Sequence, residues 1–133
     1  MLYLDTSALV KLVTSEKETV ALRDFLTERG SATTFSSYLA HTELLSAARR
    51  HGAAVTRQAR AVLAAIHLVD VTRQVLETAG VLDTGAPLRS LDAIHLATGL
   101  LTIDRLEAVV TYDRRMRVAA GDLGLVVEAP GSG

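Results

Sequence analysis

Short apolar runs that resemble β-strands alternate with longer helical patterns along the whole of this 133-residue chain. Such alternation favours a parallel sheet covered by helices on both faces, because each parallel crossover needs a connection long enough to return the chain. The sequence therefore predicts one α/β domain over residues 1–128, followed by a disordered tail over residues 129–133. The expected strands are residues 2–5, 32–35, 67–71, 108–111 and 125–127.

Capping and turn residues predict where the helices begin and end. Ser36 or Ser37, Thr56 and Ser90 are expected to cap three helix starts through their hydroxyl groups. Gly30 is expected to end a helix in the left-handed conformation. The expected helices cover residues 7–13, 17–29, from Ser36 or Ser37 to 51, 57–66, 72–80, 90–103 and 114–120.

Composition narrows the class of protein. The chain has no cysteine, which excludes disulfides, thiol nucleophiles and cysteine-type zinc sites. A net charge of −1 gives no overall basic field, so any binding of nucleic acid must rely on local arginines. The apolar stretch at residues 93–103 is shorter than the ~18 residues of a membrane span, and no basic segment precedes the first apolar run. A cytoplasmic protein is the expectation.

Four acidic residues lie where a chain of this kind normally has apolar or neutral ones. Asp5 and Asp113 each follow an apolar run, whereas Glu43 and Asp92 lie within apolar helices. A buried, isolated carboxylate is costly, so several of them entering one core indicate a cation that offsets their charge. Carboxylate oxygens are hard ligands, which favours Mg²⁺ or Mn²⁺. Acids packed together also repel, so at least one is expected to have a raised pKa without metal.

Simpler explanations exist for each acid taken alone. Asp5, followed by Thr6 and Ser7, is a common helix cap. Asp92, in a first helical turn, interacts favourably with the helix dipole by roughly 0.3–1 kcal/mol. Glu43 has Arg50 two turns further along its helix as a candidate ion-pair partner. These structural alternatives stay open at the level of single residues.

Taken together, four segments of the chain resemble the PIN-domain ribonucleases, and among them the VapC toxins of bacterial toxin–antitoxin pairs. The resemblance covers residues 1–128, in the order of the family. The four segments are DTSALVKL at residues 5–12, EL at 43–44, LDAIHLAT at 91–98 and VTYD at 110–113.

The resemblance implies a PIN-like three-layer sandwich with a five-stranded parallel sheet of order 3-2-1-4-5. It further implies a Mg²⁺- or Mn²⁺-dependent endoribonuclease that forms a homodimer and is neutralised by a cognate VapB-type antitoxin. The catalytic and metal-binding acids of the family correspond to Asp5, Glu43, Asp92 and Asp113. Thr111 and Ser7 correspond to hydroxyl groups that assist them.

Hydrolysis of a phosphodiester needs an activated water and neutralisation of charge on the phosphate oxygens, and carboxylate-bound metal ions supply both. Because water attacks, the products should carry 5′-phosphate and 3′-hydroxyl ends. His95 lies one helical turn from Asp92, where a hydrogen-bonded helix histidine near the core is favoured over a metal ligand. The arginines expected to contact RNA phosphates are Arg114, Arg115, Arg117 and Arg50.

Two other functions compete with this one. A phosphoacceptor receiver domain also combines a small parallel sheet with an acidic magnesium site, but it needs an acidic pair at the first strand and a lysine after the fifth. Asp5 stands alone, and no lysine follows Val127. A catalytically silent interaction module is the other alternative, and a nuclease assay distinguishes it from an enzyme.

Overall fold

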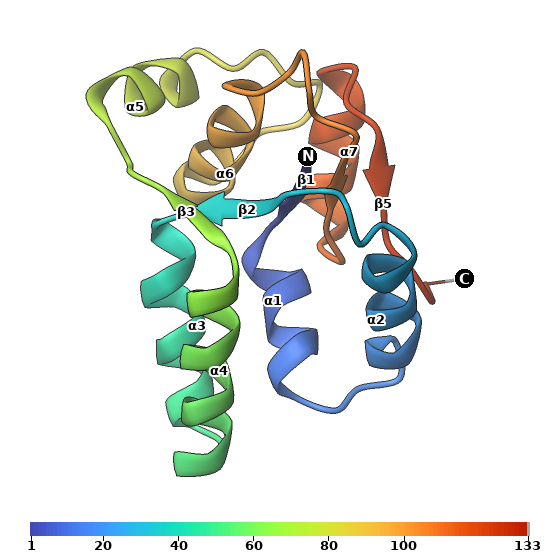
Figure 1. Cartoon of the computed structure of the whole chain (residues 1–133). Coiled ribbons are helices and arrows are strands. Elements are labelled where there is room, and N and C mark those ends of the chain that lie inside the picture. The colour runs from blue at the N-terminus through green and yellow to red at the C-terminus, as the bar shows by residue number, and fades with distance from the viewer. Residues whose placement is uncertain (133) are drawn as a thin grey trace.

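The computed structural model describes residues 1–132 and contains one parallel sheet of five strands in the order β3-β2-β1-β4-β5 (Figure 1). Strand β1 lies at the centre, with Tyr3 opposite Phe35 of β2 on one side and Val109 of β4 on the other. This confirms the predicted fold class and strand order. Receiver domains have the order 2-1-3-4-5, so the sheet excludes that alternative. The strands are β1 (Leu2–Leu4), β2 (Thr34–Ser37), β3 (His67–Val69), β4 (Ala108–Val110) and β5 (Val127–Glu128).

Helices cover both faces of the sheet (Figure 1). Helices α1 to α4 lie on one side and α5 to α7 on the other. No helix within residues 1–132 is both long and apolar enough to cross a bilayer. The helices are α1 (Thr6–Val13), α2 (Thr19–Glu28), α3 (Leu39–Arg49), α4 (Ala53–Ala65), α5 (Arg73–Gly80), α6 (Ser90–Leu100) and α7 (Arg114–Asp122).

The central strands are buried on both faces, which explains why they are apolar throughout rather than alternating. In β1, Leu2 and Leu4 pack into the core formed with helices α1 to α4. Tyr3, between them, points to the opposite core, which contains Leu96 of α6 and Met116 of α7. The period of two along one strand therefore connects both helical layers.

Two of the predicted hydroxyl caps, Thr56 and Ser90, are not the N-caps in the structure. Helix α4 begins at Ala53 rather than Arg57, because Gly52 has a positive φ of 94° and forms the N-cap. The Thr56 hydroxyl then donates to the Gly52 carbonyl oxygen at 2.9 Å instead of capping a later start. Ser90 is the first helical residue of α6, and the N-cap is Arg89, which forms no capping hydrogen bond.

The other two predicted caps were wrong in part. Helix α3 begins at Leu39, and its N-cap Tyr38 forms no side-chain capping bond, although Ser37 Oγ accepts a hydrogen bond from the Leu39 N–H at 3.1 Å. Gly30 is not among the described glycines with positive φ; its N–H donates to the Thr27 carbonyl oxygen at 3.1 Å.

The segment after β5 forms a turn that contacts the domain. The Tyr112 hydroxyl donates to the Pro130 carbonyl oxygen at 2.8 Å, and the Ser132 N–H donates to the Ala129 carbonyl oxygen at 3.0 Å. Of the tail for which the sequence predicts disorder, Gly133 lies outside the described residues.

Candidate active site

Asp5 and Asp113 meet at the carboxyl edge of the two central strands. Asp5 follows β1 and Asp113 lies three residues beyond the last residue of β4, its parallel neighbour. The Asp5 N–H donates to the Val110 carbonyl oxygen at 3.2 Å, which continues the ladder to the edge. Strand order reverses at this point, because β1 connects toward β2 and β4 lies on its other side. Open α/β sheets bind ligands at such a crevice.

Asp5 is a buried carboxylate whose two oxygens are both hydrogen-bonded. Oδ1 accepts from Ser7 Oγ at 2.6 Å and from the Ala8 N–H at 3.1 Å, and Oδ2 accepts from Thr111 Oγ1 at 2.5 Å. Only 3% of the residue is exposed. Burial raises the pKa of Asp5, and the hydrogen bonds of Ser7 and Thr111 oppose that rise. Asp5 is therefore the N-cap of α1, as the simpler explanation of this acid predicted. It is also a carboxyl group whose ionisation burial opposes.

Ser7 and Thr111 hold the two strand ends together. Each hydroxyl donates its proton to Asp5 and so accepts another hydrogen bond through its oxygen. Ser7 Oγ accepts from the Tyr112 N–H at 2.9 Å, and Thr111 Oγ1 accepts from the Asp113 N–H at 3.2 Å. The structure thus brings the two predicted auxiliary hydroxyls into contact with the first acid.

Glu43 reaches the same region from α3 and contacts His95 of α6. Its Oε1 accepts from Thr6 Oγ1 at 2.7 Å and lies 2.7 Å from His95 Nε2. Burial raises the pKa of Glu43, but the hydrogen bonds of His95 and Thr6 outweigh burial, so the pKa is lowered overall. Within residues 1–132 Glu43 forms no ion pair with Arg50, so that alternative for Glu43 is not realised.

A hydrogen-bond chain fixes the ring of His95. A carboxylate only accepts hydrogen bonds, so His95 Nε2 carries the proton that it shares with Glu43. Nδ1 lies 2.5 Å from the Tyr3 hydroxyl, which accepts from the Ser37 N–H at 3.3 Å. Burial raises the pKa of Tyr3, which keeps the phenol protonated. This confirms the prediction of a hydrogen-bonded histidine near the core.

Arg89 binds the other two acids at once. Its Nε donates to Asp92 Oδ2 at 3.0 Å, and its Nη2 donates to Asp113 Oδ2 at 3.2 Å. The second oxygen of Asp113 caps α7 by accepting from the N–H groups of Arg115 at 2.8 Å and Met116 at 3.2 Å. The sequence analysis missed Arg89. Arg89 lies three residues before Asp92, about one helical turn away, and this spacing could have identified it as a partner of Asp92.

A cleft of about 240 Å³ joins the second and third acids. Glu43 and Asp92 line it together with Arg89, Ser90 and Leu91. Arg114 and Arg115 follow Asp113 directly, at the start of α7, whereas Arg50 lies at the far end of α3 from the sheet. The structure therefore places two of the four candidate RNA-binding arginines beside the acids.

Comparisons with known proteins identify the family of the chain. The sequence model of the PIN domain matches residues 2–122. Ribonuclease VapC46 of Mycobacterium tuberculosis is 43% identical over 129 residues, which are 97% of each chain. Ribonuclease VapC47 of the same species is 39% identical over 99% of this chain and 98% of its own. This chain belongs to the PIN-domain family, among the VapC ribonucleases.

Solved structures share the PIN fold at lower identity. A chain of a toxin–antitoxin complex from Klebsiella pneumoniae superposes with a TM-score of 0.70 at 21% identity, over 98% of both chains. Mycobacterium tuberculosis VapC20, described as a toxin that cleaves the sarcin-ricin loop, gives a TM-score of 0.71 at 17% identity. That alignment covers 95% of this chain and 97% of VapC20.

The acids of this PIN domain suit a hard divalent cation by their chemistry. All the candidate ligands are carboxylates, and Asp5 and Asp92 have little access to water. Within residues 1–132, however, no three Asp, Glu or His side chains lie close enough to share one ion. Arg89 offsets the charge of Asp92 and Asp113 in this arrangement. Binding of an ion by three acids therefore requires side-chain movement, with Arg89 as the group to be displaced.

Proposed function

We propose that this PIN-domain protein is a VapC-type endoribonuclease that hydrolyses RNA phosphodiesters with Mg²⁺ or Mn²⁺. The observation that carries the proposal is the buried carboxylate of Asp5, held by Ser7 and Thr111 at the edge where β1 and β4 end. Burying a carboxyl group to 3% exposure is costly, and this one lies at the edge where open α/β sheets bind ligands.

Asp5, Glu43 and Asp92 would hold the cation, directly or through water, and Asp113 would support it from outside or hold a second ion. The bound cation supplies an acidified water and neutralises charge on the phosphate. Thr111 fixes the orientation of Asp5, and Arg89 stabilises the acids while no cation is bound. Magnesium takes only one or two carboxylates directly, so four acids exceed the immediate coordination of one ion.

RNA would be held by local positive charge, because the chain as a whole is slightly acidic. Arg114 and Arg115 are best placed to contact RNA phosphates near the acids, since they directly follow Asp113 at the start of α7. Arg117 follows on the same helix, and Arg50 would reach only RNA that extends along α3.

The test is cleavage of RNA by the purified protein with Mg²⁺ or Mn²⁺ and with EDTA. Asp5→Asn and Asp92→Asn should each lower the rate at least ~100-fold, because asparagine keeps the shape but loses the charge that holds the ion. Asp24→Asn is the matched control, since Asp24 is exposed on α2. Cleavage that persists in excess EDTA would sink the metal mechanism, and no cleavage of any RNA would favour the silent module.

The protein would also be the toxin of a pair, acting as a homodimer that a VapB-type antitoxin neutralises. A hollow of about 500 Å³ between α1 and α4 suits an amphipathic segment of such a partner, because Val10, Val13 and Val55 line it together with polar residues. The polar lining residues are Thr14, Ser15, Glu16 and His51. Val55→Asp should weaken binding of the antitoxin, with Val126→Asp as the control on another surface. Light scattering across micromolar concentrations tests the dimer, and a strictly monomeric protein would count against it.

A further inference from the structure

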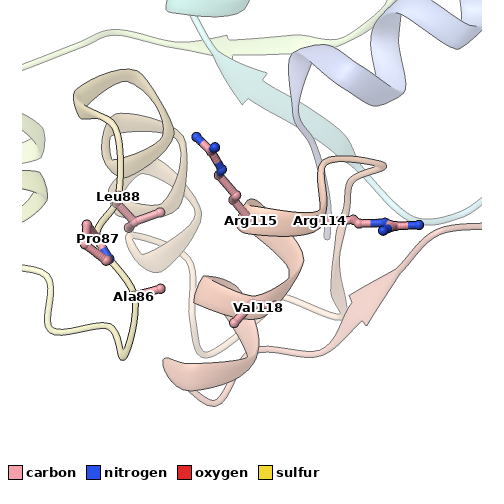
Figure 2. A pocket seen from close by; sticks show the side chains of 6 residues that line it. All are labelled: Ala86, Pro87, Leu88, Arg114, Arg115 and Val118. Carbon is pink, nitrogen blue, oxygen red and sulfur yellow. The ribbon is translucent and has the colours of Figure 1, made fainter.

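A second hollow lies beside the acidic cleft. It has a volume of about 490 Å³, within the range of about 300–1,000 Å³ that ligand pockets occupy. One wall is the loop between α5 and α6, and the other is helix α7 (Figure 2). The lining residues are Ala86, Pro87, Leu88, Arg114, Arg115 and Val118.

The surface of this hollow is mainly apolar, with positive charge at one end. Figure 2 shows Ala86 and Leu88 on the loop side and Val118 on the helix side, while the Arg115 side chain extends past Leu88 and Arg114 points away from the loop. Val118 is 57% exposed, so its methyl groups face solvent rather than the core. An apolar surface with one cationic end suits a ligand that has flat apolar faces and a negative charge.

One ion pair connects the walls of the hollow to the acidic cleft. Leu88 precedes Arg89 in the loop wall, and Arg114 follows Asp113 in the helix wall. Arg89 Nη2 donates to Asp113 Oδ2 at 3.2 Å, so this contact joins the two walls. Arg89 also lines the cleft that contains Glu43 and Asp92. The ion pair of Arg89 and Asp113 thus lies between the hollow and the acidic cleft.

We infer that this hollow binds one unpaired nucleobase of the RNA, next to the phosphodiester at the acids, with Arg115 on an adjacent phosphate. The inference rests on the proposed ribonuclease function. A base has two apolar faces for Leu88 and Val118, and its backbone carries the negative charge that Arg115 complements. Unpaired bases are the part of RNA whose faces are free to contact side chains, including the plane of an arginine such as Arg115.

The experiment uses a labelled single-stranded RNA that the wild-type protein cuts, together with versions of it that each lack one base. Binding is measured by fluorescence anisotropy in EDTA, so that no cleavage occurs. The variant is Val118→Asn, and its control is Val126→Asn, because Val126 is exposed to 58% on another surface. Arg115→Gln is compared with Arg105→Gln, which removes the same charge near the amino ends of the strands.

We expect one abasic position to weaken binding to wild type by about fivefold, the effect expected when a modest part of the apolar faces of one base leaves water. The same abasic position should have no effect on Val118→Asn, whose affinity for the intact RNA should be reduced by a similar factor. Arg115→Gln should bind every RNA of the set more weakly, whereas both controls should bind like wild type.

Three results would overturn the inference. Wild type that cuts RNA but tolerates every abasic position would refute the base site alone. A change of oligomeric state in Val118→Asn, seen by light scattering, would assign the hollow to contact between two copies of the chain. Wild type that neither binds nor cuts any RNA would refute the proposed function together with this inference.

Discussion

His95 Nε2 lies 2.7 Å from Glu43 Oε1, and this contact joins α6 to α3 just beyond the carboxyl end of β1. Because Thr6 binds the same oxygen, Glu43 is held from two sides through Oε1. Its other oxygen receives no hydrogen bond from the residues that the structure describes. That leaves one oxygen of Glu43 available to the cleft that it shares with Asp92.

Removing the Tyr3 hydroxyl should disturb Glu43 without touching it. Tyr3→Phe keeps the ring but leaves His95 Nδ1 without its hydrogen-bond partner and the Ser37 N–H without its acceptor. We expect a loss of about 1–3 kcal/mol in the free energy of unfolding, the usual cost of unsatisfied buried groups. The kcat for RNA cleavage should fall while KM stays the same. The control is Tyr38→Phe, since Tyr38 is 49% exposed. Full activity in Tyr3→Phe would show that the hydrogen bonds from Tyr3 through His95 do not position Glu43.

Thr111 should depend on its hydroxyl and not on its shape. Thr111→Val is nearly isosteric but removes the donor to Asp5 Oδ2 and the acceptor of the Asp113 N–H. The free energy of unfolding should fall by about 1–3 kcal/mol, and activity should fall with it. Thr111→Ser restores the hydroxyl and should recover most of both. Urea unfolding of the two variants is the measurement, and equal losses would show that the methyl group contributes as much as the hydroxyl, which contradicts the prediction.

The stability of the metal-free protein should decrease as pH rises. Burial raises the pKa of Asp5 above its ordinary value of 3.8, so the folded protein binds this proton more tightly than the unfolded chain. The resulting stabilisation is complete below pH 3.8 and is lost as pH rises through the folded pKa. Asp5→Asn should therefore melt higher than wild type at neutral pH in EDTA. Glu43 has the opposite sign, because its lowered pKa contributes stability that is lost on acidification.

Melting curves of wild type, Asp5→Asn and Glu43→Gln over about pH 4–8 separate these two effects. The difference between wild type and Asp5→Asn should grow with pH. A constant difference across that range would show that Asp5 has an ordinary pKa.

Arg89 should compete with metal. Arg89→Gln leaves Asp92 and Asp113 without their shared cation, so the variant should melt lower than wild type in EDTA. Millimolar Mn²⁺ should then raise its melting temperature more than it raises that of wild type, because no guanidinium has to be displaced. A ligand at a hundred times its dissociation constant adds about 2.7 kcal/mol of stability, which sets the scale. Arg105→Gln is the charge-matched control, and an identical Mn²⁺ response in all three proteins would contradict the competition.

The sequence predicted the positions of the acids because each has a local signal. Asp5 and Asp113 follow apolar strands, and Glu43 and Asp92 interrupt apolar helices, so each stands out against its neighbours. Alternation of strands and helices likewise predicted the layers, since it reflects burial that every element shows by itself. The strand order came with the family resemblance, and the sheet confirms it.

The family resemblance supplied Ser7 and Thr111 as partners of Asp5, but contacts between residues far apart along the chain could not be predicted from the sequence. Tyr3 and His95 are separated by 92 positions, and Arg89 and Asp113 by 24. Mutual repulsion was the expected cause of a raised pKa, but burial is the larger cause at Asp5, and Arg89 offsets two of the acids. The predicted start of α4 was wrong for a local reason. Gly52, with its positive φ, is the N-cap, so the helix begins at Ala53, before Thr56.

The pairing of β1 with β4 has a consequence for synthesis. Asp5 is translated 106 positions before its partner Thr111. At about 5–20 residues per second, the two are separated by roughly 5–20 s of translation. During that interval the growing chain carries Asp5 without the strand that completes its surroundings, so we expect a chain that ends before Thr111 to be inactive. An inhibitor made during this delay would therefore be present before the site around Asp5 is complete.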